Sequence, residues 1–220
     1  MKLTKSDFNL SCIEMGHFLL GKVLVRRLEN NVIIKGKIVE TECYLGGIDK
    51  ASHSFGGRRT ARNEAMFMPA GTAYVYMTYG MYYCFNISSK ELGAAVLIRS
   101  LEPIQGIEKI EELRKMKMKN KISAKKFKTT ELCNGPSKLC IGLDIRKDNL
   151  NRVDLCENDM LWLESPIDET DFTLVTCARI GIASCGEEWA NKPLRFYIYQ
   201  NLNVSKRDKK AEKYMESITL

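Results

Sequence analysis

Residues 32–44 carry the pattern that most restricts how this chain can fold. Alternate residues of a β-strand point to the same face. The residues on the apolar face of this segment are Val32, Ile34, Ile38, Glu40, Glu42 and Tyr44, with Lys35 and Lys37 on the other face. Burying an ionised carboxylate is costly unless a partner stabilises it. The two glutamates therefore indicate either pairing with buried arginines or a place in the chemistry of the protein.

The rest of the chain predicts a mixed α/β fold of the α+β type, built on antiparallel strands. Period-two patterns predict further strands at 23–28, 73–78, 82–87, 95–100, 160–164, 173–180 and 194–199. Helical spacing and end signals predict helices at 11–20, 102–119 and 136–143. Residues 46–72 are rich in glycine, arginine, asparagine and serine, so we expect them to cross the surface as a loop.

Length and composition favour one intracellular domain. With 220 residues, the chain can bury a substantial core in a single domain over 1–205, followed by a charged, frayed tail at 206–220. It has eight cysteines without a C-x-x-C pair and only two histidines, which argues against a metal site and predicts buried, reduced thiols. The N-terminus has no signal peptide pattern, and no apolar run reaches the length of a membrane span. We therefore expect a protein that is neither secreted nor attached to a membrane.

Positive charge suggests a polyanionic partner without identifying it. The formal net charge is +7, and residues 114–128 contain eight lysines and arginines and no acidic residue. A nucleic-acid-binding edge and a solvated helix face with a mobile loop explain this run equally well. Pro136 is predicted to begin a helix whose first turn presents Ser137 and Lys138, where free backbone N–H groups suit a phosphate.

Residues 74–83 contain five tyrosines and a predicted hairpin turn. Tyr79 precedes Gly80, which permits the turn, so Tyr79 is expected at an exposed tip. A bulky aromatic residue at such a tip is a candidate wedge for insertion between stacked bases. The alternative is an ordinary pair of aromatic-rich strands.

Ten segments of the chain, in order between about residue 19 and residue 205, closely resemble the alkyladenine (3-methyladenine) DNA glycosylase family. These segments are 38–46 (IVETECYLG), 53–60, 62–63, 66–68, 74–88, 96–99, 101–103, 132–139 (LCNGPSKL), 179–181 and 193–197. Agreement over ten segments in the same order along the chain is more specific than a match to one short motif.

The resemblance implies a fold and an activity. It implies a single domain around a curved antiparallel sheet flanked by helices, unlike the helix-hairpin-helix glycosylases. It also implies a monofunctional, monomeric enzyme that flips alkylated or deaminated purines, such as 3-methyladenine or hypoxanthine, out of duplex DNA. Hydrolysis of the N-glycosidic bond would leave an abasic site, without metal or cofactor. The enzyme would act in the cytoplasm, at the nucleoid, or in the nucleus.

The resemblance also implies roles for individual residues. By motif position, Glu42 is the general base that activates a water, whereas Glu40 is expected to be structural. The residues of the base pocket are Tyr44, His53, Tyr76 and Asn86, with Asn86 crowding the exocyclic amino group of guanine. Tyr79 fills the vacated stack. The residues implied to contact the DNA backbone are Thr60, Arg62, Met81, Arg99 and Lys138.

Arg99 has two possible partners on physical grounds. It projects beside Leu97 from a predicted strand, where an arginine meets either a phosphate or a carboxylate. Two other functions also remain open for the whole chain. One is a bifunctional glycosylase that nicks the strand through a lysine, for which the family pattern provides no residue. The other is an architectural protein that uses Tyr79 as a wedge without chemistry.

Overall fold

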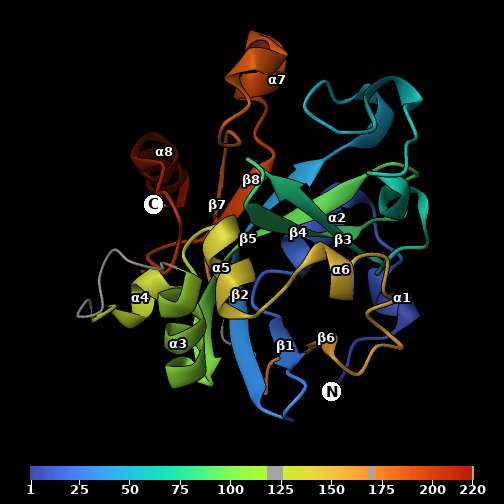
Figure 1. Cartoon of the computed structure of the whole chain (residues 1–220). Helices are drawn as coiled ribbons and strands as arrows, with labels where there is room; N and C mark the ends of the chain where they lie inside the picture. The colour runs from blue at the N-terminus through green and yellow to red at the C-terminus, as the bar shows by residue number, and fades with distance from the viewer. Residues whose placement is uncertain (118–125, 168–170, 220) are drawn as a thin grey trace.

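The computed structural model describes residues 1–117, 126–167 and 171–219. An eight-stranded antiparallel sheet forms its centre (Figure 1). The strands are β1 (Val23–Arg27), β2 (Ile33–Tyr44), β3 (Ala73–Thr78), β4 (Tyr82–Ser88), β5 (Ala95–Gln105), β6 (Leu161–Glu164), β7 (Leu174–Cys177) and β8 (Arg195–Ile198). They follow the order β3-β4-β5-β2-β1-β6, with β8 beside β2 and β7 beside β8.

Eight α-helices and four 3₁₀-helices surround the sheet in the described part of the chain. The α-helices are α1 (Lys5–Phe8), α2 (Cys12–Phe18), α3 (Ile107–Lys117), α4 (Thr129–Leu132), α5 (Pro136–Gly142), α6 (Lys147–Leu150), α7 (Glu187–Asn191) and α8 (Lys209–Thr219). The 3₁₀-helices are η1 (Gly46–Ile48), η2 (Phe55–Gly57), η3 (Glu64–Phe67) and η4 (Ala183–Cys185). Helices α3, α4 and α5 lie together beside the sheet (Figure 1).

Strand β2 organises the sheet. Its first half pairs with β1, residues Glu40–Glu42 pair with β8, and β5 runs along its other edge. The register of β2 against β5 shifts between Ile38 and Glu40 and again between Glu40 and Thr41. Such irregularities bend a strand and increase its twist. The sheet is therefore curved, which confirms the predicted fold class.

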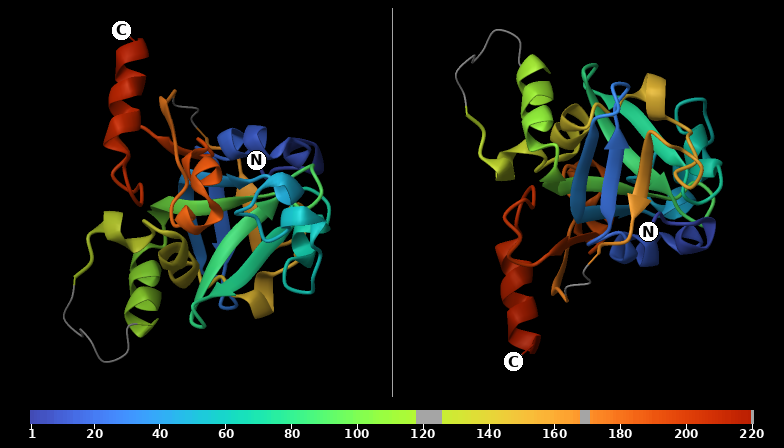
Figure 2. Two further views of the ribbon diagram at one scale, coloured as in Figure 1. Left: turned by 90° about the horizontal axis from the view of Figure 1, so that it is seen from above. Right: turned by 90° about the horizontal axis from the view of Figure 1, so that it is seen from below.

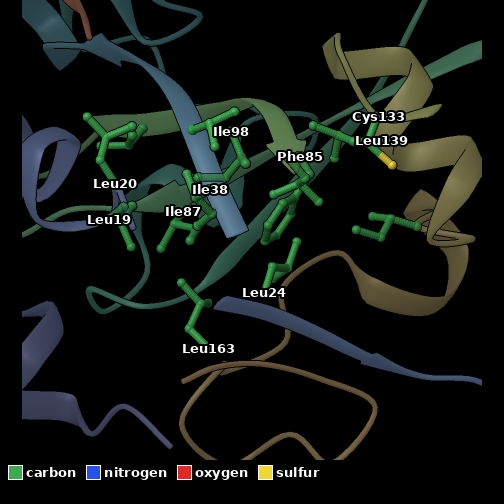
Figure 3. Packing of buried hydrophobic residues seen from close by; sticks show 14 of the residues in the cluster. Leu19, Leu20, Leu24, Ile38, Phe85, Ile87, Ile98, Cys133, Leu139 and Leu163 are labelled. Atoms are coloured by element: carbon green, nitrogen blue, oxygen red, sulfur yellow. The ribbon is translucent and has the colours of Figure 1, made fainter. Parts of the chain in front are cut away.

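The two faces of β3, β4 and β5 have different neighbours, as the period-two pattern predicts. Phe85, Ile87 and Ile98 are fully buried and pack with Ile38 and Leu24 in the main core (Figure 3). Helix α2 covers the β2 part of the sheet, and the Thr41 hydroxyl donates to the Gly16 carbonyl at 2.8 Å. Gly16 is needed there because a Cβ atom would come within 2.4 Å of the Cys43 sulfur. All eight cysteines are free thiols, and six are buried.

The predicted helix at 102–119 begins too early. Residues 102–105 belong to β5 and pair with β2, and α3 begins only at Ile107. Pro103 is tolerated in the strand because the register shifts beside it, between Lys35 and Gly36, and a bulge releases proline from the hydrogen-bond ladder. Gly106, with φ of 75°, then turns the chain into the helix. Part of the basic run 114–128, namely 118–125, lies outside the described residues, so its role stays a prediction.

The tail at 206–220 is helical over most of its length rather than frayed. Helix α8 extends away from the sheet (Figure 2) but is anchored at its start by Glu212, which is 7% exposed. The Glu212 carboxylate accepts hydrogen bonds from Tyr197 and Arg207 at 3.0 and 2.7 Å. These contacts and a half-buried Met215 stabilise the first turns.

The predicted surface loop at 46–72 is only partly at the surface. It contains η1, η2 and η3 and buries polar residues such as Asp49 and Asn63. Among the helices in the described ranges, none has the length and apolar character needed to cross a bilayer.

Candidate active site

A cavity of about 390 Å³ opens on the face of the sheet opposite the main core. Strand β3 contributes Tyr74 and Tyr76 to its wall, and β4 contributes Cys84 and Asn86. The other lining residues are Tyr44, Ala51, His53, Met66, Thr78, Tyr79, Ala95, Leu97, Arg99, Pro136, Ser137, Ile180, Gly181 and Ile182. Segments distant in the sequence thus converge on one cavity, and the four predicted pocket residues line it.

Aromatic rings form one wall of the cavity. The His53 ring lies 4.7 Å from the Tyr76 ring in an edge-to-face arrangement, and the Tyr74 ring lies 5.3 Å from that of Tyr76. Burial raises the pKa of Tyr44, Tyr74 and Tyr76, which therefore remain neutral phenols. Such a neutral, aromatic surface is suited to stacking against a flat ring.

Tyr74 is a member of this wall to which the sequence analysis gave no role. It is 1% exposed, and its hydroxyl is hydrogen-bonded to His53 Nδ1 at 2.8 Å. The alternation that pairs Tyr74 with Tyr76 was the available signal. The contact with His53 was not visible because His53 lies in an irregular loop.

Glu42 is fully buried directly behind the cavity wall. Its Oε2 accepts a hydrogen bond from the Tyr44 hydroxyl at 2.9 Å and lies 3.2 Å from Arg99 Nη1. Its Oε1 accepts from the Ile180 backbone N–H at 2.7 Å. All three partners line the cavity, although Glu42 itself does not. Glu42 thus pairs with a buried arginine, which is the first alternative from the sequence. Its partners line the cavity, and its part in the chemistry stays a prediction.

Glu40 has a more enclosed environment on the same side of β2. Its carboxylate accepts from Arg99 Nε at 3.2 Å, Arg195 Nη1 at 2.9 Å, Ser100 Oγ at 3.0 Å and the Ser205 N–H at 2.7 Å. It is fully buried and is not among the residues that line the cavity. With four donors, its acceptor sites are used within the protein, which fits the structural role expected for it.

Arg99 joins the two carboxylates. Its Nε faces Glu40 and its Nη1 faces Glu42, and the residue is 7% exposed. Although burial alone would lower the pKa of Arg99, the charges of Glu42 and Glu40 raise it. Of the two kinds of partner predicted for Arg99, the structure shows it paired with carboxylates.

Asn86 lines the cavity and is also held by the backbone. Its Nδ2 donates to the Tyr74 carbonyl at 3.0 Å, and the residue is 4% exposed. This hydrogen bond fixes the amide in place at the cavity wall. Asn86 is therefore both a hydrogen-bonded structural amide and a residue of the cavity wall.

Of the remaining predicted residues, Tyr79 lines the cavity and the others lie outside its lining. Tyr79 is 89% exposed at the turn between β3 and β4, as predicted, and also borders the cavity. The Arg62 guanidinium lies 5.4 Å from the Tyr76 ring centre, and the Thr60 hydroxyl donates to Asn63 Oδ1. Met81 is 54% exposed beside the turn. Lys138 donates to Asn134 Oδ1 at 2.7 Å, outside the cavity lining.

A buried ion pair between Asp49 and Arg179 completes the surroundings of Glu42. The sequence analysis included Arg179 in a motif but gave it no role, and it did not identify Asp49. No local pattern marks such a pair, because its members are 130 residues apart. In the described chain, no three His, Cys, Asp or Glu side chains lie close enough to hold a metal ion.

Comparison with known proteins gives consistent matches. A sequence profile of the family described as methylpurine-DNA glycosylase (MPG) matches residues 6–202. The DNA-3-methyladenine glycosylase of Homo sapiens is 48% identical over 93% of this chain and 68% of its own length. The Mus musculus protein of the same name is 47% identical over 96% of this chain and 63% of its own. A Clostridium tetani protein provisionally named 3-methyladenine DNA glycosylase is 46% identical over 94% of this chain and all of its own. The chain thus spans about two thirds of the mammalian relatives and the full length of the clostridial one.

Proposed function

This chain belongs to the methylpurine-DNA glycosylase family, and on that basis we propose that it is a DNA-3-methyladenine glycosylase of base excision repair. One observation carries the proposal above the others. A buried carboxylate, Glu42, lies behind an aromatic cavity, and each of its three polar partners belongs to the cavity wall. The arrangement suits an enzyme that holds a flat base beside a hydrolytic carboxylate.

The damaged purine enters the cavity by rotating out of the duplex, because the glycosidic carbon cannot be reached inside the stack. The rings of Tyr44, His53 and Tyr76 form its walls in this proposal. Tyr79 fills the gap that the base leaves, since it is the exposed aromatic residue at the neighbouring hairpin tip. A cavity of about 390 Å³ lies within the usual size range of small-ligand sites, about 300–1,000 Å³.

Glu42 acts on a water that enters from the cavity. The carboxylate accepts a proton from this water, which attacks the sugar carbon, and its negative charge stabilises the oxocarbenium-like transition state. Most glycosidases use a second carboxyl group as an acid. Glu40 is unsuited to that task because four donors already occupy it. A cationic base such as 3-methyladenine needs no such acid, whereas hypoxanthine requires a proton from another source.

Substrate selection follows from the cavity wall. Asn86 is fixed by its bond to the Tyr74 carbonyl, so it cannot readily move aside for an additional group on the base. We infer that this amide excludes the exocyclic amino group of undamaged guanine. Arg62, whose guanidinium lies beside the Tyr76 ring, binds the DNA backbone in this proposal, together with Thr60 and Lys138.

The test is base release by the Glu42→Gln variant. Duplex DNA methylated with dimethyl sulfate provides the substrate, and released 3-methyladenine is counted under single-turnover conditions. We expect the rate to fall about 10²–10⁴-fold because the general base and its charge are lost. The Kd for the same DNA should change little. Glu164→Gln serves as the control. Glu164 lies on β6 and pairs with Lys35 of β2, outside the cavity lining, so this variant should release base at the wild-type rate.

The same assay separates the other two functions. An architectural protein would bind the DNA but release no base. A bifunctional lyase would be trapped on the DNA by borohydride, yet no lysine is among the described residues that line the cavity. Near-normal cleavage by Glu42→Gln would refute the role of this carboxylate.

A further inference from the structure

Asp49 and Arg179 form a fully enclosed ion pair next to the proposed catalytic carboxylate. Arg179 Nη2 donates to Asp49 Oδ1 at 2.9 Å, and Nη1 donates to Oδ2 at 2.5 Å. The side chains of both residues are 0% exposed. This two-pronged geometry fixes the relative orientation of the two groups more strictly than a single contact would.

Asp49 fixes the loop that carries His53. Its Oδ2 accepts from the Leu45 N–H and its Oδ1 accepts from the Ala51 N–H, both at 3.0 Å. Leu45 directly follows Tyr44 of β2, and Ala51 lines the cavity two residues before His53. One carboxylate thus connects the end of β2 to the loop that carries His53.

Arg179 fixes the segment that contacts Glu42. Its Nη1 also donates to the Cys43 carbonyl at 2.9 Å, and its guanidinium lies 4.8 Å from the ring centre of Tyr44. The next residue, Ile180, donates its backbone N–H to Glu42 Oε1. Arg179 therefore contacts the two residues that follow Glu42 along β2 and sets the position of a donor to Glu42 itself.

The contribution of this ion pair to folding stability is too small to be its only role. Enclosing two charges has a desolvation cost that often cancels their attraction, so an apolar pair of similar size would be about as stable. Among buried side-chain N and O atoms of the described residues, Arg179 Nε is the one without a hydrogen-bond partner. The guanidinium is thus oriented by Asp49, Cys43 and Tyr44 at the expense of a further hydrogen bond.

We propose that Asp49 and Arg179 are positioning residues, which lock the end of β2, the His53 loop and the Ile180 segment into the arrangement that Glu42 needs for base release. The inference rests on the proposed function. It predicts an effect on the rate of the chemical step that is separate from any effect on folding or DNA binding. Displacement of a reacting group by about 1 Å can cost roughly 100-fold in rate.

The experiment compares Asp49→Asn and Arg179→Lys with Glu212→Gln. Glu212 is a largely buried carboxylate whose arginine partner is partly exposed, and it lies on α8 and contacts no cavity residue named here. For each variant, the single-turnover release of 3-methyladenine from methylated duplex DNA, the Kd for that DNA and the melting temperature are measured. Release is measured below the melting temperature of each variant that folds.

Asp49→Asn and Arg179→Lys should slow base release by about 10–100-fold, with Kd within about threefold of wild type. Glu212→Gln should lower the melting temperature without slowing release. Because the pair acts through Glu42, adding Asp49→Asn to Glu42→Gln should reduce the remaining rate by less than twofold.

Wild-type release rates in both folded variants would overturn the inference. Fully additive losses in the double variant would also overturn it. If one variant does not fold, the other provides the comparison. Absence of base release by the wild-type protein would instead refute the proposed function, so the two failures are distinguishable.

Discussion

Tyr74 holds the imidazole of His53 through Nδ1, which leaves Nε2 available to a ligand. Burial, assisted by the positive charge of Arg62, lowers the pKa of His53 to about 4. The ring is therefore neutral near pH 7. A neutral imidazole can stack on a cationic base without the repulsion that a charged ring would add.

This lowered pKa predicts how His53 affects stability. In the unfolded chain the imidazole has an ordinary pKa of 6.5, so between about pH 6.5 and 4 the unfolded state binds a proton that the folded state does not. Stability should therefore fall as the pH decreases through this window and rise as it increases. The effect is reduced by solvent because the ring is exposed at the cavity mouth.

The measurement is the difference in melting temperature between wild type and His53→Gln across this pH range. As the pH falls, the melting temperature of the wild type should decrease more than that of His53→Gln, because glutamine does not titrate. A difference that is constant with pH would contradict the assignment.

At the scale of elements, the β3–β4 hairpin presents Tyr79 in a strained conformation. Tyr79 has φ of 51° and Gly80 has φ of 67°, the pattern of positive φ that tight type I′ turns require. Glycine and asparagine adopt this region readily, whereas a tyrosine does so at a cost of about 1–2 kcal/mol. The hairpin thus keeps an unfavourable residue at an exposed position, which is consistent with the DNA contact proposed for Tyr79.

Tyr79→Asn should therefore change stability and activity in opposite directions. The free energy of unfolding should rise by about 1 kcal/mol because asparagine tolerates the positive φ. Binding to lesion DNA should weaken by about 1–3 kcal/mol because the stacking ring is lost.

Denaturant unfolding and titration with methylated duplex DNA measure the two quantities. Tyr79→Phe keeps both the ring and the strain, so it should match wild type in both. Loss of stability in Tyr79→Asn would show that the tyrosine is not strained in the turn.

At the scale of the whole molecule, the net charge of +7 includes cations with different environments. Arg99 is neutralised within the fold by Glu40 and Glu42. Arg62, in contrast, is exposed at the cavity mouth. Only cations of the second kind can release counterions from DNA on binding.

Salt dependence of DNA binding should therefore separate these groups. Arg62→Ala and Lys138→Ala should each reduce the slope of log K against log salt by about 0.9, the value for one phosphate contact. Lys2→Ala should leave the slope unchanged because Lys2 pairs beside β6, at the other end of the strand order from β3.

Titration of fluorescent duplex DNA at several salt concentrations gives these slopes. A slope in Arg62→Ala and Lys138→Ala equal to that of wild type would exclude both residues as phosphate contacts.

The amino-acid sequence by itself determined which residues share a face of each strand. Alternation depends only on local backbone geometry, and it correctly placed Arg99 on the side of Leu97. The same rule accounts for the pairs Tyr74 with Tyr76 and Cys84 with Asn86 in the cavity wall. The eight strands, the helix that Pro136 begins and the exposed tip at Tyr79 were predicted for the same reason.

The tertiary structure alone decided which groups meet across long sequence separations. Three sets of contacts are of this kind. Arg99 pairs with Glu40 and Glu42, Asp49 pairs with Arg179, and Glu212 of α8 contacts Tyr197 of β8. The extension of β5 through Pro103 also required its partner strand. Local propensity contains no information about such contacts, because their energies depend on how strongly water is excluded once the fold has formed.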